Sequence, residues 1–275
     1  MQNISLRLEK NLSKKRIDEV LVEKGLFKSR SEARRFIIEG KILLNGQLVQ
    51  KAGTLVKDED QIILKEGKKY VSRGGLKLEF AIDQFGIDPK GLITSDIGTS
   101  TGGFTDFLLK RGVKRVYDVD VGYGQFDYSL RNDKRVILLE RTNARYLTQK
   151  EIPEQLDLIV MDVSFISIVK ILPALTPLMK EESSIISLIK PQFEGKREYL
   201  KKGIVKDKGI HKEILFNLID NISRIGLCVT DATYSPVKGK KGNIEFFFLI
   251  KKHGKLVNFH HIYKIVDEVW ERMAR

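Results

Sequence analysis

Four charged residues stand in or beside apolar segments of this sequence, where charges are uncommon. Asp162 follows the apolar run LIVM, and Lys190 follows IISLI directly before a proline. Glu245 interrupts the segment NIEFFFLI, and Lys77 lies in the helix-like segment RGGLKLEFAI. Buried charges are usually paired for satisfaction alone, so a structural ion pair is the simpler interpretation of any two of them. Four charges in the alternating order Lys, Asp, Lys, Glu instead favour a site that performs chemistry.

The chemistry that such a set suits is activation of a hydroxyl group, which is a poor nucleophile until its proton is held or removed. A lysine amine has an ordinary pKa of about 10.4, so it accepts a proton at neutral pH only where its surroundings disfavour the charge. Burial and a second lysine act in that direction, whereas carboxylates oppose them and orient the amine. We predict Lys190 as the base or the hydroxyl-orienting group, with Asp162 and Glu245 positioning Lys190 and Lys77.

The segments that must position these residues alternate between strands and helices from residue 92 onward. Predicted strands are LITSDIG, RVYDVDV, RVILLE, LDLIVMDV and SSIISLIK. Helical stretches of about 10–15 residues between several of them predict an α/β fold with a doubly wound, mostly parallel sheet. The later runs CVTDATYSPV and NIEFFFLI, joined by the turn-rich KGKKGN, suit an antiparallel pair at the edge of the sheet.

The carboxyl ends of the strands in such a sheet form the crevice in which ligands bind. Asp162 and Lys190 each end a predicted strand, so both face this crevice if their strands are neighbours. The helical pattern of RGGLKLEFAI places Leu76 and Phe80 on the inner face of a helix and lets Lys77 lean over the mouth of the crevice.

A glycine-rich turn follows the first strand, in DIGTSTGGFTDFLLKRG. Gly98, Gly102 and Gly103 allow a tight turn and close approach of a ligand at a helix N-terminus, although a plain turn is the alternative. The spacing G-x-x-x-G-G departs from the dinucleotide fingerprint G-x-G-x-x-G. Asp120 ends the next strand, where such folds bind ribose hydroxyls. Asp96, before the turn, suits the cationic amino end of S-adenosylmethionine better than it suits a pyrophosphate.

The first 64 residues read as a small separate module of two helices and a hairpin. Ser29 and Glu32 form a predicted capping box at the start of the second helix, and Asn45-Gly46 between apolar runs predicts the hairpin turn. Residues 1–70 contain sixteen Lys and Arg against ten Asp and Glu. This charge excess indicates either a solvated helix face or a surface that grips phosphates. The basic residues predicted to form that surface are Arg30, Arg34, Arg35 and Lys41.

The composition of the whole chain narrows the class of protein. A net charge of +13 over 275 residues points to a polyanionic partner, with nucleic acid the leading choice. The single cysteine, Cys228, excludes an internal disulfide and a zinc site made of thiolates, and no metal site is predicted. No apolar segment approaches the roughly 18–20 residues of a membrane span, and the N-terminus lacks the apolar core of a signal peptide. We expect a cytoplasmic protein without stable membrane association.

Residues 14–64, which include RIDEVLVEKGLFKSRSEARRFIIEGKILLNGQLV, resemble the alpha-L (S4-like) RNA-binding module. A small-subunit ribosomal protein, some pseudouridine synthases and certain rRNA methyltransferases share this module, so the resemblance implies binding of structured RNA. The polar stretch EGKKYVSRGG then resembles a hinge. We predict an RNA-binding domain over residues 1–64, a linker over 65–75 and a catalytic domain over 76–275.

The remaining motifs resemble those of the TlyA family. DIGTSTGGFTD and DVDVGYGQ match its first two cofactor motifs, and YVSRGGLKLE, ERTNAR, DVSFIS, IKPQFE and GNIEFF extend the likeness through almost the whole chain. Members are described as hemolysins and as rRNA 2′-O-methyltransferases, with a catalytic domain similar to that of FtsJ-type methyltransferases. The resemblance implies a Rossmann-like sheet with an antiparallel last strand, S-adenosylmethionine as cofactor, and cytidine 2′-O-methylation in ribosomal RNA, with ribosomal subunits as partners.

The resemblance also implies roles for particular residues. The family's Lys-Asp-Lys-Glu tetrad falls on Lys77, Asp162, Lys190 and Glu245. The predicted cofactor-binding residues are Asp96, Gly98, Ser100, Thr101, Gly102, Gly103, Asp120 and Asn143, the last of which is equally well interpreted as a helix cap. The residues predicted to bind RNA are Arg30, Arg34, Arg35, Lys41, Arg73, Lys196 and Arg197. The last two come from the basic loop EGKREYLKKGIVKDKG, which is interpreted equally well as a lid over RNA or as a solvated loop.

Other activities fit the sequence less well. Methyltransferases that act on exocyclic amines usually carry a proline-containing motif where this chain has DVSF, and carbon-5 methylation of pyrimidines needs a cysteine nucleophile. Two alternatives remain, a hemolysin-like membrane-active protein and a non-catalytic RNA-binding factor in ribosome assembly. The target nucleotide, the choice of ribosomal subunit and the oligomeric state are not readable from these residues.

Overall fold

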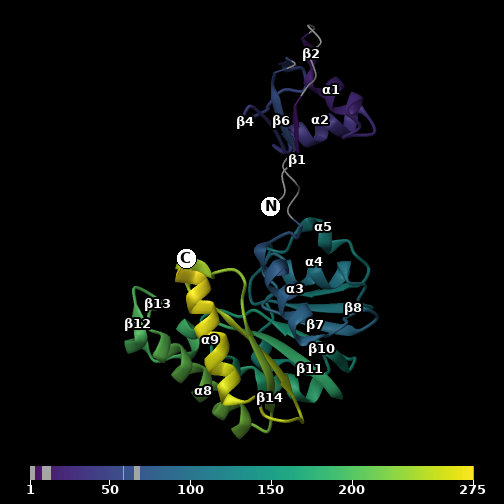
Figure 1. Ribbon diagram of the computed structural model, residues 1–275. Helices are drawn as coiled ribbons and strands as arrows, with labels where there is room; N and C mark the ends of the chain where they lie inside the picture. Colours follow the sequence, from purple (N-terminus) through teal and green to yellow (C-terminus); the bar gives the residue numbers. More distant parts are fainter. Residues whose placement is uncertain (1–3, 8–13, 58, 65–68, 275) are drawn as a thin grey trace. The chain divides into compact units, whose positions relative to one another are not determined.

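The computed structural model describes residues 4–7, 14–57, 59–64 and 69–274, and divides the chain into two compact units, Met1–Lys69 and Tyr70–Arg275 (Figure 1). Residues 70–75, expected in the linker, lie in the larger unit. Helix α3 (Arg73–Phe85) begins there, and the Ser72 side chain caps it by accepting a hydrogen bond from the Gly74 amide. Residues 65–68 of the predicted linker lie outside the described residues.

The smaller unit packs helices α1 (Ile17–Glu23) and α2 (Arg30–Ile38) around a shared core that includes Ile17, Leu21 and Ile37. Its main sheet is antiparallel in the order β1-β6-β3-β4, and β2, which directly precedes α1, forms a second antiparallel pair with β5. The strand bounds are β1 Ile4–Arg7, β2 Lys15–Arg16, β3 Ile42–Leu44, β4 Gln47–Leu48, β5 Leu55–Val56 and β6 Gln61–Leu64. Strand β1 carries no signal that the sequence analysis recognised.

The local signals read from the smaller unit are present in the structure. The Ser29 hydroxyl accepts a hydrogen bond from the Glu32 amide at 3.2 Å, as a capping box requires. The Glu32 carboxylate accepts from the amide of Lys28 instead of that of Ser29. Asn45 and Gly46 both have positive φ, 51° and 80°, which is the backbone of a tight hairpin turn between β3 and β4.

The larger unit is built on a seven-stranded sheet in the order β14-β15-β11-β10-β7-β8-β9. Strands β9, β8, β7, β10 and β11 run parallel, and β15 runs antiparallel to both of its neighbours. The predicted antiparallel pair is therefore confirmed, with β15 inside the sheet and β14 at its edge. The strand bounds are β7 Ile93–Ile97, β8 Arg115–Val119, β9 Val136–Leu139, β10 Leu156–Met161, β11 Met179–Ile189, β14 Cys228–Tyr234 and β15 Phe246–Lys251.

Helices cover both faces of this sheet (Figure 1). One face packs against α3 and α4 (Gly103–Lys110), whose residues Leu78, Phe104 and Phe107 share a core with the strands. The other face packs against α6 (Leu172–Leu175), α8 (Lys208–Arg224) and α9 (Phe259–Ala274). Because both faces are buried, the central strands are apolar along most of their length.

The connections are less helical than the sequence predicts. Between β8 and β9 lies the four-residue helix α5 (Tyr128–Arg131), and between β9 and β10 only a 3-10 turn at Ala144–Tyr146. The β10–β11 connection contains Pro173 and Pro177, which sit at the starts of the short helix α6 and of the following 3-10 turn, where a missing N–H is tolerated. Within the described residues, no helix is both long enough and apolar enough to cross a membrane.

Candidate active site

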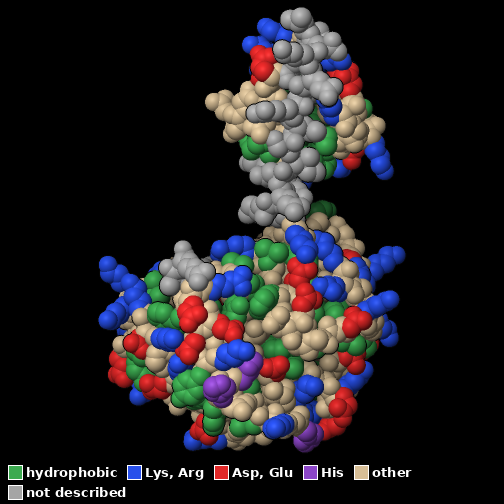
Figure 2. All heavy atoms as spheres, in the orientation of Figure 1, with side chains coloured by type: hydrophobic (Ala, Val, Ile, Leu, Met, Phe, Trp, Pro, Cys, Tyr) green, Lys and Arg blue, Asp and Glu red, His purple; other side chains and the backbone are tan. Residues whose placement is uncertain are grey.

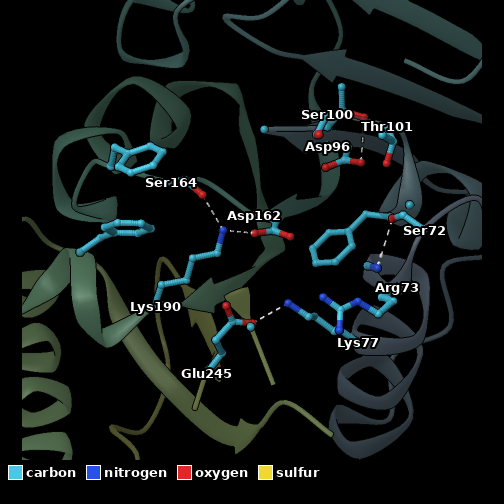
Figure 3. Close-up of a pocket in the computed structure, with 18 of the residues that line it drawn as sticks. Ser72, Arg73, Lys77, Asp96, Ser100, Thr101, Asp162, Ser164, Lys190 and Glu245 are labelled. Atoms are coloured by element: carbon cyan, nitrogen blue, oxygen red, sulfur yellow. Dashed lines mark hydrogen bonds and ion pairs between the residues drawn. The ribbon is translucent and has the colours of Figure 1, made fainter. Parts of the chain in front are cut away.

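A pocket opens where the strands of the larger unit end, and all four charged residues singled out in the sequence line it (Figure 3). Asp162 follows β10, Lys190 follows β11, Glu245 precedes β15, and Lys77 comes from the second turn of α3. The glycine-rich turn after β7 forms another part of the wall, through Gly98, Ser100, Thr101 and Gly103 among others.

Asp162 and Lys190 form an ion pair because their strands are parallel neighbours. Met161 and Ser187 are register partners in β10 and β11, so the two strands end close together. Lys190 Nζ lies 2.5 Å from Asp162 Oδ1 and 2.8 Å from Ser164 Oγ. An ammonium group has three N–H donors. The contact with Ser164 is a hydrogen bond, whereas the contact with Asp162 is an ion pair only, since Asp162 Oδ1 has no hydrogen-bond partner among the described residues. Lys190 therefore keeps an N–H donor for a ligand in the pocket.

Lys77 and Glu245 form a second ion pair, with 2.5 Å between Nζ and Oε2. Both residues are buried, with 8% and 3% of their surface exposed. The expected inner face of α3 was wrong in detail, because Leu76 is exposed while Leu78, Ala81 and Ile82 are buried. The helix turns Lys77 into the pocket instead of over its mouth, and the acid at 245 neutralises the buried amine.

The two ion pairs act on each other electrostatically. Burial raises the pKa of the Glu245 carboxyl above its ordinary value, and the Lys77 ammonium opposes that rise. The charge of Asp162 raises the same pKa and that of Lys190 lowers it. The pocket therefore holds two amines and two carboxylates in one electrostatic group, and Figure 3 shows the four side chains converging.

Gly239 gives Glu245 the room it needs. A Cβ atom at position 239 would lie 2.0 Å from Glu245 Oε1 and 2.5 Å from its Cδ. We expect Gly239→Ala to displace the Glu245 carboxylate and leave the Lys77 ammonium buried without its partner. The free energy of unfolding should fall by about 1–3 kcal/mol, the penalty for an unsatisfied buried polar group. Trp270 fluorescence during urea unfolding measures this, since it is the only tryptophan and lies in the larger unit.

The double variant Gly239→Ala/Glu245→Ala separates this clash from a general effect of alanine at 239. With the Glu245 side chain removed there is nothing for the new methyl group to displace, so the substitution at 239 should become nearly neutral in that background. An equal loss in both backgrounds would contradict the proposed role of Gly239.

Gly98 is a position in the turn that leaves no room for a side chain. Its φ is +84°, and a Cβ atom would lie 2.7 Å from the backbone oxygen of Asp162. The Asp162 amide in turn donates to the Ile97 carbonyl at 2.9 Å. The absence of a side chain at Gly98 thus lets the ends of β7 and β10 approach, which places the glycine turn beside Asp162.

Asp96 lies at the floor of the pocket, buried at the end of β7. Its Oδ2 atom accepts hydrogen bonds from the amide and hydroxyl of Thr105, at 3.1 and 2.8 Å. Its Oδ1 atom is buried without a hydrogen-bond partner among the described residues. Burial, which the Thr105 hydroxyl opposes, raises the pKa of Asp96 to about 7, and the nearby Asp162 charge adds to the rise.

Three predicted cofactor-binding residues serve the turn or lie away from the pocket lining. Asp120 accepts hydrogen bonds from the Ser100 amide at 2.8 Å and the Gly122 amide at 2.6 Å, so its carboxylate braces the turn. Asn143 caps the 3-10 turn by accepting from the Arg145 amide, which is the alternative left open for it. A Cβ atom on Gly102 would meet Leu130 and Phe126 instead of the pocket.

An aromatic pair at the pocket escaped the sequence analysis. Phe165 and Phe193 line the pocket, with their ring centroids 4.9 Å apart. Phe165 is 90% exposed and has φ +64°, a backbone that a bulky residue rarely adopts. Glu194 holds the segment in place by accepting from the Ile168 amide. An exposed aromatic residue in a strained turn is typical of a ligand-binding position, and DVSF was its only signal in the sequence.

The predicted RNA-binding residues of the smaller unit differ in their contacts. Arg30 and Arg34 share a face, as predicted, but both pair with the buried Asp18, together with Arg16. Burial of Asp18 is outweighed by these hydrogen bonds, so its pKa lies well below the ordinary value. Arg35 and Lys41 instead contact Glu39 and lie over the Phe36 ring.

The basic residues predicted in the larger unit are also separated. Arg73 lines the pocket. Lys196 and Arg197 lie in the segment after α7 (Pro191–Glu194), and neither is part of the pocket lining. Figure 2 shows Lys and Arg side chains spread over this face of the larger unit among Asp and Glu, without one large basic patch.

Comparison with known proteins agrees with this architecture. Residues 70–252 match the FtsJ-like methyltransferase family and residues 15–62 match the S4 domain. Hemolysin A of Brachyspira hyodysenteriae is 44% identical over 84% of this chain and 97% of its own length. The 16S/23S rRNA (cytidine-2′-O)-methyltransferase TlyA of Mycobacterium tuberculosis is 40% identical over 86% of this chain and 89% of its own.

A solved structure from Streptococcus thermophilus, provisionally assigned as a hemolysin, superposes with a TM-score of 0.74 at 36% identity, over 96% of this chain and 98% of that one. The mostly parallel sheet, the glycine turn and these matches over most of the chain lead to one assignment. The chain belongs to the FtsJ-like methyltransferase family, among relatives named TlyA and hemolysin A, and it carries an S4 domain before the methyltransferase domain.

Proposed function

We propose that this protein is an S-adenosylmethionine-dependent RNA methyltransferase that methylates the ribose 2′-oxygen of cytidine in ribosomal RNA. The observation that carries the proposal is the convergence of two lysine–carboxylate pairs in one pocket beside the glycine turn. The TlyA relative is named for this reaction, and an S4 domain suits a structured RNA substrate. In this proposal the domains keep the predicted roles, with RNA binding in the smaller unit and catalysis in the larger.

The pocket residues fit the proposed cofactor. The unpartnered Oδ1 atom of Asp96 is a natural acceptor for the ammonium group of S-adenosylmethionine. The turn over Gly98–Gly103 offers backbone close to the ligand because Gly98 has no side chain. Asp120 holds the turn in shape through the Ser100 amide. When bound, the cofactor supplies an electrophilic methyl group on a sulfonium.

The lysine–carboxylate pairs would prepare the ribose hydroxyl. Lys190 Nζ donates a hydrogen bond to Ser164 and pairs with the charge of Asp162, so a further N–H donor can hold the hydroxyl oxygen. The proton that the hydroxyl loses can be taken up at the Asp162 carboxylate, so that the pair gains one proton as the oxygen is methylated. Lys77, fixed by Glu245, would face the same oxygen and stabilise its developing negative charge.

The aromatic pair suits a base removed from its stack. Phe165 exposes most of its ring at the pocket and leans on Phe193. A single-stranded or flipped nucleotide can stack on such a surface, which places its ribose near Lys190. We propose that Phe165 holds the base of the target nucleotide.

The decisive experiment maps 2′-O-methyl groups in ribosomal RNA by mass spectrometry, from cells with and without this protein. The proposal expects at least one cytidine that is methylated only when the protein is present. Purified protein with labelled cofactor should then transfer methyl groups to isolated ribosomal subunits. If the ribosomal RNA carries the same methyl groups in cells with and without the protein, and the purified protein still binds RNA, the protein is a non-catalytic assembly factor. Lysis of RNA-free liposomes by the purified protein would favour the membrane-active alternative.

RNA binding by the smaller unit gives a separate prediction. Arg35 is 65% exposed at its side chain and pairs only loosely with Glu39, at 3.8 Å. We expect Arg35→Ala to weaken RNA binding and to lower the slope of log affinity against log salt by about 1, as for one lost phosphate contact. The free energy of unfolding should stay unchanged, since exposed ion pairs contribute little.

Arg34→Ala is the comparison variant, since Arg34 donates to the buried Asp18 carboxylate at 3.0 Å. It should lower the free energy of unfolding of the smaller unit by about 1–3 kcal/mol, the typical value for a hydrogen bond to a charged group. Filter binding over a range of salt concentrations and urea unfolding of the full chain measure both quantities. A salt slope that Arg35→Ala leaves unchanged would remove Arg35 from the proposed RNA surface.

A further inference from the structure

A second buried carboxyl group lies next to Asp96 and is not part of the pocket lining. Asp118 in β8 is the register partner of Asp96 in β7, and both are almost completely buried. Thr105 Oγ1 lies 2.8 Å from Asp96 Oδ2 and 2.5 Å from Asp118 Oδ1. Thr99 Oγ1 lies 3.2 Å from each of the same two oxygens. Two carboxyl groups thus share two threonine hydroxyls.

The number of hydrogen atoms in this cluster limits its charge. Each threonine hydroxyl can donate one hydrogen bond. Thr105 Oγ1 touches two carboxyl oxygens at hydrogen-bonding distance, so one of those contacts needs a hydrogen atom from a carboxyl group. Among the described residues, neither Asp96 nor Asp118 forms an ion pair that would favour two negative charges. Two adjacent buried carboxylates without a cation are strongly disfavoured, so one of the two carries a proton.

The surroundings decide which carboxyl group is the neutral one. Asp96 accepts a backbone N–H from Thr105, which favours its ionised form, and it borders the pocket. Asp118 is 0% exposed, and its hydrogen-bond partners among the described residues are the two hydroxyls. The proton therefore belongs on Asp118, which donates to Thr105 Oγ1, while Thr105 donates to Asp96.

We propose that Asp118 is a positioning residue, a buried neutral acid that acts through Thr105 to hold the Asp96 carboxylate ionised and oriented toward the cationic end of the cofactor. This inference rests on the proposed function, because Asp96 is taken to bind the cofactor's ammonium group. A neutral aspartic acid side chain carries both a hydrogen-bond donor and an acceptor. Asparagine has a similar size and carries both as well, so it is the substitution that can replace the neutral acid.

The electrostatics also disfavour two negative charges in this cluster. Burial, with the Asp96 charge adding to it, raises the pKa of Asp118 well above the ordinary value. Burial raises the pKa of Asp96 as well, to about 7. Asp162 is the other charged group that acts on Asp96 from a neighbouring strand, and Lys190 neutralises it.

Cofactor affinity measured by calorimetry tests the inference with four variants. Asp118→Asn should keep the dissociation constant within about threefold at pH 8, because its amide donates to Thr105 as the acid does. Asp118→Leu and Thr105→Val should weaken binding roughly tenfold or more, as expected when a charged group loses a supporting hydrogen bond. Thr94→Val is the matched control, a buried threonine of β7 whose hydroxyl donates to the Arg115 carbonyl, and it should leave the affinity unchanged.

Infrared spectroscopy measures the proton directly and does not depend on cofactor binding or on folding of the leucine variant. The wild-type protein at pH 8 should show the carbonyl stretch of a protonated carboxylic acid, and Asp118→Asn should lack it. Absence of that difference band would overturn the inference, and so would an Asp118→Asn variant that binds cofactor as weakly as Asp118→Leu. If the wild-type protein binds no cofactor at all, the proposed function fails, while the band still decides the state of Asp118.

Discussion

Lys190→Ala is expected to lower the rate of methyl transfer by roughly 10²–10⁴-fold, the range for a group that moves or holds a proton in the reaction. The physical reason is that Lys190 Nζ, which contacts Asp162 and Ser164, keeps a donor for the substrate hydroxyl. Cofactor affinity should stay within a fewfold of wild type, since the glycine turn and Asp96 are untouched. RNA affinity should also be kept, because the S4 domain lies in the other unit. Single-turnover transfer of a labelled methyl group, with separate binding measurements, separates these effects.

A lysine at the other end of the same strand provides the control. Lys180 lies near the start of β11, the strand that Lys190 follows, and pairs with Asp157 of β10 at 2.5 Å, at the opposite end of the two strands from the pocket. Lys180→Ala removes the same side chain and an ion pair of the same kind without touching the pocket. It should leave methyl transfer unchanged. Equal rates in the wild-type and Lys190→Ala proteins would refute the assigned role, and equal losses in both lysine variants would point to a general effect on the sheet.

The placement of Asp162 and Lys190 could be predicted from the sequence because all strands of a parallel sheet have their carboxyl ends at the same edge. Each residue directly follows an apolar strand, and neighbouring parallel strands end at the same edge. The glycine turn followed from the same rule at the end of β7. What the sequence could not give is the partner of each charge, since ion pairing depends on side-chain direction at ångström scale. Lys77 shows this, because the pattern of α3 suggested a lysine that leans over the mouth of the crevice, and the fold buries it against Glu245.

The residues missed were those whose role depends on contacts across the sheet. Asp118 lies within an apparently ordinary strand, and only its register with Asp96 reveals the shared hydroxyls. In the sequence, Phe165 looks like an ordinary apolar residue. The structure shows that its backbone has a positive φ and that its side chain is exposed. In the smaller unit, the basic face predicted from helical spacing is present, but Arg30 and Arg34 neutralise Asp18. Helical spacing predicts which residues share a face. Only the tertiary contacts show which of those charged residues are paired within the protein and which are left to bind a ligand.

Asp96→Asn is expected to weaken cofactor binding roughly 100-fold or more at pH 8, as when one partner of a buried charge pair is removed. In the proposed function the Asp96 carboxylate is the acceptor for the ammonium group of the cofactor, and asparagine keeps the shape without the charge. The wild-type affinity should itself decline as the pH falls through about 7, where the free protein protonates Asp96. Calorimetric titration with S-adenosylmethionine between pH 6 and 8.5 measures both effects. An unchanged dissociation constant for the variant would remove Asp96 from the cofactor site.

The same substitution should stabilise the protein when no cofactor is bound. The pKa of Asp96 is raised from 3.8 to about 7 by burial, so the folded protein holds this proton more tightly than the unfolded chain does. Stability therefore falls as the pH rises between these values, by on the order of 4 kcal/mol at most, and asparagine avoids this loss.

Asp157→Asn is the comparison variant, and it should lower the free energy of unfolding at pH 8. Although burial alone would raise the pKa of Asp157, Lys180 and the Ile93 amide lower it, so its ionised form stabilises the fold. Urea unfolding of both variants at pH 5 and pH 8 tests this contrast in the free energy of unfolding. If Asp96→Asn is less stable than the wild type at pH 8, the ionised Asp96 carboxylate stabilises the fold, and the prediction is contradicted.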